Sequence, residues 1–135
     1  MSEATNRAIN PWTWGDRVAV SQAIETTGGQ RILHCSGQTS LAADGAVLHA
    51  GDMDAQTRQA LDNVEVVLTA AEMTLTDVVR LNYYTTDVNA FREAMHDVIV
   101  DRLRAAGCAP ACTLLGVQQL ARPELLIEIE ATAIA

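Results

Sequence analysis

Two stretches of the chain repeat apolar side chains at the spacing of a helix. Residues 54–71 place alanine, leucine and valine on one face, and Asp52 stands where the helix N-cap is expected. A second helix is expected over residues 90–106, with Asn89 as its N-cap and Gly107 at its end. Each helix would bury one face against the rest of the fold.

Shorter runs of apolar and β-branched residues predict strands. They cover residues 18–23, 31–36, 77–85, 113–118 and 125–133. In the last run, apolar residues alternate with Glu128, Glu130 and Thr132, which is typical of a strand with one buried face. The order of elements predicts an α+β fold, a mixed β-sheet with two helices on one face. A chain without a third helix can cover the other face by assembling with copies of itself.

The chain has the length of one ordinary domain. Its 135 residues, 49% of them hydrophobic, suffice for a hydrophobic core. Residues 1–15, which include Pro11, Trp12 and Trp14, are expected to form a loosely ordered N-terminal arm. Residues 16–135 are expected to form the single domain.

The charge balance argues against several classes of partner. The chain carries 17 acidic and 9 basic residues, a net charge of −8, without a cluster of lysine or arginine. Nucleic acids and anionic membranes are bound through basic side chains, so neither is an expected partner. The N-terminus lacks the basic and then apolar order of a secretory signal, and this favours a cytoplasmic location.

The cysteines predict neither a disulfide framework nor a metal site. Cys35, Cys108 and Cys112 are an odd number, and small buried free thiols are their ordinary interpretation. The spacings of cysteine and histidine match no zinc pattern. No metal site is therefore expected from these residues.

Several short motifs, in order along the chain, resemble those of the RidA/YjgF (Rid) family. They are the His-Cys-Ser-Gly-Gln turn at 34–38, the helix signature at 51–63, the strand segments 77–79 and 84–87, and the C-terminal signature at 110–131. The resemblance extends from about Val20 to Ala135 with matching spacing, which is far more specific than one short motif.

The resemblance implies a fold, an assembly and an activity. The fold would be chorismate-mutase-like, and the assembly a homotrimer with three clefts between neighbouring subunits. The activity best known for the family is the hydrolysis of reactive 2-enamines and 2-imines to 2-keto acids and ammonia. A small-molecule substrate is thus implied, with neither a metal nor an organic cofactor.

The chain departs from the family at the position that carries the chemistry. Deaminating members have an arginine directly after Pro-Ala, where it pairs with the substrate carboxylate through two parallel hydrogen bonds. That position is Cys112 in this sequence. A desolvated carboxylate left without its cation is strongly disfavoured, so substrate binding must differ unless another arginine, such as Arg17 or Arg122, substitutes.

Other positions of the implied site are partly retained. By resemblance, Ser36 and Gly37 bind substrate and Glu128 is a catalytic carboxylate. Val20 stands in place of an aromatic residue and Met95 in place of an asparagine, both among the substrate-binding positions. The site keeps its turn and its carboxylate but loses its anion clamp.

Two of these residues have more than one interpretation. Cys112 is either a nucleophile, which requires its thiolate, or a small apolar filler. Glu128 is either a carboxylate that activates water or an outward residue of an alternating strand. The sequence therefore predicts an imine, enamine or amide hydrolase that uses Cys112 and Glu128, and the alternative is a non-catalytic metabolite-binding trimer. An RNA-cleaving activity is disfavoured by the negative charge.

Overall fold

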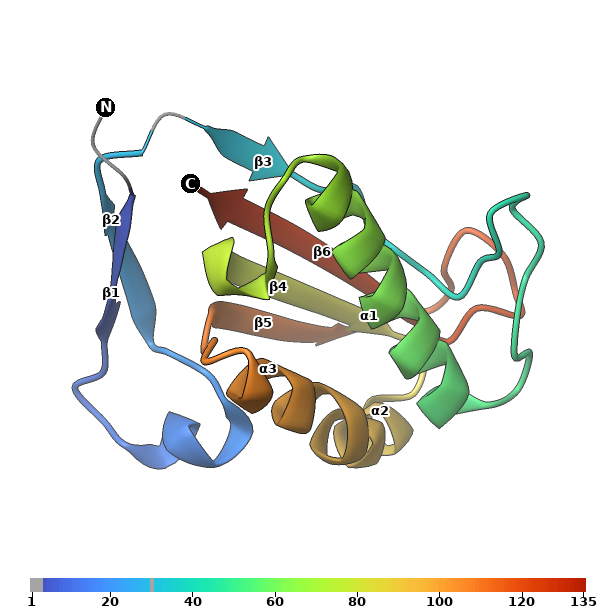
Figure 1. The fold of residues 1–135 in the computed structure, drawn as a ribbon. Coiled ribbons are helices and arrows are strands. Elements are labelled where there is room, and N and C mark those ends of the chain that lie inside the picture. The colour runs from blue at the N-terminus through green and yellow to red at the C-terminus, as the bar shows by residue number, and fades with distance from the viewer. Residues whose placement is uncertain (1–3, 30) are drawn as a thin grey trace.

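The computed structural model describes residues 4–29 and 31–135, and its centre is a four-stranded mixed sheet. The strands lie in the order β3-β6-β4-β5, and their bounds are Ile32–His34 (β3), Ile127–Ile134 (β6), Val78–Thr85 (β4) and Ala111–Gly116 (β5). β6 is antiparallel to both β3 and β4, whereas β4 and β5 are parallel. The helices cover one face of this sheet (Figure 1), which confirms the predicted fold class.

The first long helix, α1 (Met53–Ala70), begins where the sequence predicts. An oxygen of the Asp52 side chain accepts a hydrogen bond from the backbone N–H of Ala55 at 3.1 Å. The carboxylate satisfies one of the free N–H groups of the first turn and lies at the positive end of the helix dipole. A short 3-10 turn, η2 (Leu75–Asp77), then leads into β4.

The second helical segment is continuous but changes its winding along its length. It consists of α2 (Val88–Ala94), the π-helical segment η3 (Met95–Val100) and α3 (Asp101–Ala105). The predicted N-cap at Asn89 is wrong, because Asp87 accepts the hydrogen bond from Ala90 N at 3.1 Å. The predicted end at Gly107 is confirmed by its left-handed φ of 67°.

The N-terminal region is more ordered than the sequence predicts. β1 (Thr5–Ile9) and β2 (Ala23–Thr27) form a separate antiparallel pair, joined through the 3-10 helix η1 (Trp14–Val18). The strand predicted over residues 18–23 is wrong, because η1 occupies its start and Ala19 has a left-handed φ of 54°. The first three residues of the predicted arm lie outside the described residues. The β1–β2 pair stands at one end of the main sheet (Figure 1).

The two faces of the main sheet differ in chemistry. The face toward the helices is apolar, and its core includes Leu61, Val64, Leu68, Leu81, Tyr83, Phe91, Ile99, Leu103, Ile127 and Ile129. The opposite face, here called the open face, carries Arg80, Asn82, Tyr84, Thr113, Glu128 and Glu130. No helix covers the open face in the described part of the chain (Figure 1). In that part, no helix is both long and apolar enough to cross a bilayer.

Candidate functional site

The turn after β3 lies directly against the last strand. Gln38 pairs with Ile129 through two backbone hydrogen bonds of 2.7 and 2.9 Å, which fixes the turn beside β6. A Cβ atom on Gly37 would lie 2.5 Å from Cδ of Glu128, so any larger residue would require the carboxylate or the turn to shift. The structure therefore places Gly37 directly against Glu128, two of the residues that the sequence analysis names.

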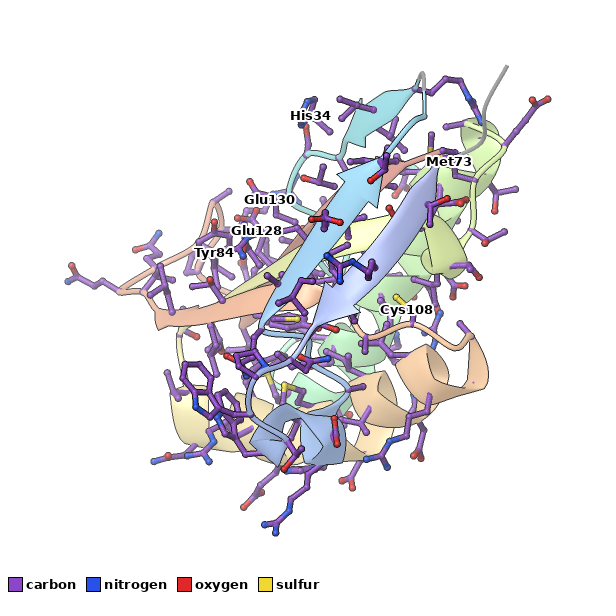
Figure 2. The ribbon with its side chains drawn as sticks, turned by 90° about the vertical axis from the view of Figure 1, so that its left-hand side faces the viewer. His34, Met73, Tyr84, Cys108, Glu128 and Glu130 are labelled. Atoms are coloured by element: carbon purple, nitrogen blue, oxygen red, sulfur yellow. The ribbon has the colours of Figure 1, made fainter. Side chains whose placement is uncertain are left out.

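The carboxylate of Glu128 is held in a partly desolvated, acidic environment. Burial, and then the negative charge of Glu130, raise the pKa of Glu128. Glu130 accepts hydrogen bonds from Asn82 Nδ2 at 2.9 Å and from Tyr84 Oη at 3.2 Å. Figure 2 shows the side chains of Tyr84, Glu128 and Glu130 grouped on one side of the ribbon. A raised pKa brings a carboxylate nearer to the range in which it serves as a general base at neutral pH.

Cys112 lies on the other face of the sheet from Glu128. Residues opposite one another in register on neighbouring strands share a face, and Cys112 is paired with Leu81, which points into the core. Glu128 is paired with Tyr84, whose side chain alternates to the open face. Within one chain, the two predicted catalytic residues therefore do not meet.

The thiol of Cys112 is surrounded by groups that keep it protonated. Burial raises its pKa to about 12, although a hydrogen bond with Tyr83 and the charge of Arg80 act in the opposite direction. The thiol donates to the carbonyl of Pro110 at 3.4 Å. At neutral pH the group is a neutral thiol with a local hydrogen-bond acceptor.

The remaining predicted positions lie elsewhere. Val20 lines a hollow of about 300 Å³ together with Arg104 and Cys108, and the lining includes neither Glu128 nor Cys112 among the described residues. Met95 is half-buried at the start of η3 and packs against the core. Neither residue is brought to the turn at Gly37 by the fold of a single chain.

A larger hollow of about 670 Å³ lies under the β1–β2 pair. Its lining comes from both strands, from η2, from the C-terminus and from Cys108, whose thiol donates to Val78 O at 3.7 Å. Burial raises the pKa of Cys108 to about 11. This hollow shares no lining residue with the turn at Gly37, and Cys108 is an ordinary buried thiol within it.

The arginines named as substitutes for the lost clamp are engaged or remote. Arg122 donates to the carbonyl of Gly45 at 2.7 Å, and Arg17 is exposed on η1. The cation nearest to Cys112 in the register is Arg80, whose guanidinium donates to Thr113 Oγ1 at 2.5 Å. Arg80 is not among the predicted site residues, although its place two residues before Asn82 on an alternating strand indicates that it points away from the core.

The described residues contain no group of three or more histidine, cysteine, aspartate or glutamate side chains able to hold a metal ion. The polar groups beside Glu128 are hydrogen-bonded amide, phenol and carboxylate groups. A carboxylate with a raised pKa in such surroundings can accept and return a proton.

These features define a small α+β protein with a glycine turn set against a carboxylate of the last strand. The sequence profile described as Endoribonuclease L-PSP matches residues 17–135, and the chain belongs to the RidA/YjgF (Rid) family. The crystal structure of the Rid family protein YyfB from Yersinia pestis has a TM-score of 0.86 and is 38% identical, covering 96% of this chain and 98% of that one.

Two relatives of known name show the same similarity in sequence. A RutC family protein of Pyrococcus horikoshii is 34% identical over 113 residues, which is 84% of each chain. The 3-aminoacrylate deaminase RutC of Acinetobacter baylyi is 29% identical over 110 residues, which is 82% of this chain and 84% of that protein. The Pyrococcus protein is named only by its family, whereas the Acinetobacter protein is named by a reaction.

Proposed function

We propose that this protein is a deaminating hydrolase of small imines or enamines, with Glu128 as its general base. The observation that carries the proposal is the packing of Gly37 against Glu128, which leaves backbone and carboxylate side by side. The similarity to a protein named 3-aminoacrylate deaminase supports the class of substrate. Cys112, the departure from the family pattern, is proposed to line the same site.

The proposed reaction is the addition of water to a carbon–nitrogen double bond. An enamine first gains a proton at carbon and loses one from nitrogen, which gives the imine. Water then bonds through oxygen to the imine carbon while Glu128 accepts one of its protons, and the nitrogen gains a proton. The resulting carbinolamine expels ammonia, and a carbonyl compound remains. Imine and water are thus converted to carbonyl compound and ammonia without an oxidant.

The proposal requires a second copy of the chain. Cys112 and Glu128 point to opposite faces of one sheet, so a shared cleft can form only when β5 of one protomer lies near the Gly37 turn of another. The open face also favours a cover, because no helix packs on it in the described part of the chain (Figure 1). A homotrimer, typical of the family, is the proposed assembly.

The role proposed for Cys112 is that of a protonated thiol rather than a thiolate nucleophile. A pKa of about 12 leaves a negligible thiolate fraction at neutral pH. A small neutral side chain at this position lines the cleft and leaves room for the substrate. The nucleophile interpretation would need a nearby base from another protomer.

The test of this function is ammonia release from 2-aminoacrylate and 3-aminoacrylate, each generated in the assay and compared with the uncatalysed rate. Glu128→Gln should lower the catalysed rate about 100-fold or more, as expected for the loss of a general base. Glu93→Gln, at an exposed position of α2, is the matched control and should leave the rate unchanged. Equal rates for Glu128→Gln and the unchanged protein would contradict the role of Glu128.

A second candidate function is metabolite binding without turnover. It is favoured by the missing arginine and by the neutral thiol at position 112. It predicts saturable binding of a keto acid such as 2-ketobutyrate with no ammonia release from either enamine. Since such binding involves no proton transfer, Glu128→Gln should leave it unchanged.

A further inference from the structure

We propose that Glu130 of β6 is a positioning residue, a fixed carboxylate that makes its neighbour Glu128 the proton acceptor of the pair. Two side chains of β4, Asn82 and Tyr84, hold Glu130 in place. The inference rests on the proposed function, in which Glu128 takes a proton from water. It gives a role to Glu130, which the alternating pattern marks only as an outward residue of the strand.

The two carboxylates are neighbours on one face of the sheet. Glu128 and Glu130 are separated on β6 by Ile129, which is fully buried in the core. Successive residues of a strand point to opposite faces, so both glutamates project from the open face, with their Cβ atoms about 7 Å apart. Figure 2 shows the two side chains on the same side of the ribbon. At this distance the charge of one carboxylate acts on the other.

Glu130 is anchored by two hydrogen bonds from β4. Asn82 Nδ2 donates to Oε1 of Glu130 at 2.9 Å, and Tyr84 Oη donates to the same atom at 3.2 Å. Tyr84 is paired in register with Glu128, so its ring runs diagonally across the strands to reach Glu130. Partial desolvation, followed by the charge of Glu130, raises the pKa of Tyr84, so the phenol remains a protonated donor at neutral pH. The orientation of the Glu130 carboxylate is therefore fixed.

Glu128 lies in different surroundings. On one side it meets the backbone of the turn, where a Cβ on Gly37 would lie 2.5 Å from its Cδ. The donors of β4 bind Glu130, and none of them binds Glu128 among the residues that the structure describes. The oxygens of Glu128 remain for water or substrate. Two carboxylates in unlike surroundings take different roles, so the anchored one supplies charge and the other exchanges a proton.

The charge of Glu130 makes Glu128 a better base. Burial, and then the charge of Glu130, raise the pKa of Glu128. A carboxylate of higher pKa accepts a proton from water more readily, provided that it is still ionised at the working pH. The anchored neighbour therefore favours proton transfer without touching the substrate.

Glu130 is the charged group nearest to Glu128 in the register of the sheet. The register places Arg80 of β4 and His34 of β3 both opposite Thr132, one row beyond Glu130. The turn after β3 carries no ionisable side chain, and the remaining titratable group of the open face is the phenol that anchors Glu130. Within the described chain, the acidic neighbour thus dominates the charge that Glu128 experiences.

The experiment follows the titration of Glu128 by NMR, in intact protein labelled with ¹³C at the side-chain carboxyl carbons of glutamate. The resonance of Glu128 is assigned by its loss in Glu128→Gln. Glu130→Gln keeps an acceptor for Asn82 and Tyr84 but removes the charge, so it should lower the titration midpoint by at least about 0.5 pH unit. Glu130→Asp keeps the charge and should shift the midpoint less. Glu93→Gln, at an exposed position of α2, is the matched control and should leave the midpoint unchanged.

The pH profile of ammonia release provides the functional readout. Its acidic limb should move to lower pH in Glu130→Gln by the same amount as the NMR midpoint, because the base then remains ionised to lower pH. A merely structural defect would reduce the rate without moving this limb. A shifted midpoint without ammonia release would support the effect of Glu130 and contradict the deaminase proposal instead.

An unchanged midpoint of Glu128 in Glu130→Gln would overturn the inference. Tyr84→Phe is a second variant should Glu130→Gln unfold, since it removes one of the two anchoring hydrogen bonds. It frees the carboxylate of Glu130 to move away, so it should lower the midpoint in the same direction by a smaller amount. An unchanged midpoint in that variant would equally contradict the role of the anchored pair.

Discussion

The two sides of the proposed cleft differ in their chemistry. On one side, the turn at Gly37 lies against the carboxylate of Glu128. On the other side, the edge strand β5 carries the neutral thiol of Cys112. The difference teaches that the two parts of the proposed site can be tested separately. The first depends on close packing, and the second on the charge and size of one side chain.

The largest effect is expected on the side of the turn, from Gly37→Ala. The added methyl group would lie 2.5 Å from Cδ of Glu128, so the carboxylate must move or the turn must shift. Overpacking of this kind costs about 1–3 kcal/mol of stability. Because displacement of a base by an ångström impairs proton transfer, ammonia release should fall at least about tenfold.

The measurement for Gly37→Ala is the rate of ammonia release together with the midpoint of thermal unfolding. Gly45→Ala is a control for the glycine change itself, since nothing lies within 4 Å of a Cβ there, although its positive φ of 87° adds local strain. Unchanged turnover in Gly37→Ala would show that the contact with Glu128 has no part in the reaction.

A smaller effect is expected on the other side, from Cys112→Arg. A guanidinium on β5 should strengthen pyruvate binding about tenfold relative to the unchanged protein. The physical reason is that the carboxylate gains a forked, permanently charged partner.

The control for Cys112→Arg is Cys112→Gln, which extends the side chain without adding charge. Titration with pyruvate and with methyl pyruvate, which lacks the charge, separates a charge effect from a change of shape. Equally strengthened binding in the glutamine and arginine variants would contradict a carboxylate site at this edge of the sheet.

The sequence was sufficient to predict most of the fold because its signals are local. The helix α1 and its cap at Asp52 follow from apolar spacing and one side-chain hydrogen bond. The alternating strand β6 follows from its period of two residues. The strand β1 was missed because its residues are mostly exposed and it pairs with β2 across a gap in sequence. The 3-10 helix η1 was missed because its first residues were assigned to the N-terminal arm and Val18 to a strand.

The candidate site was less predictable, since it depends on register and on distances through space. The contact between Gly37 and Glu128 agrees with the motifs, although the spacing alone gives no distance. Cys112 and Glu128 lie on opposite faces of the sheet because of the register in which β5, β4 and β6 pair. Composition cannot reveal that register.

The most direct test of the central claim, that Glu128 rather than a thiolate performs the chemistry, is the pH profile of ammonia release for the unchanged protein and for Cys112→Ala. The base must be ionised, and burial raises the pKa of Glu128, so the rate should fall as the pH decreases through that raised pKa. We expect the same acidic limb, and rates within about twofold, in both proteins. A rate that instead keeps rising with pH toward the thiol pKa of about 12, and that is lost in Cys112→Ala, would contradict the account.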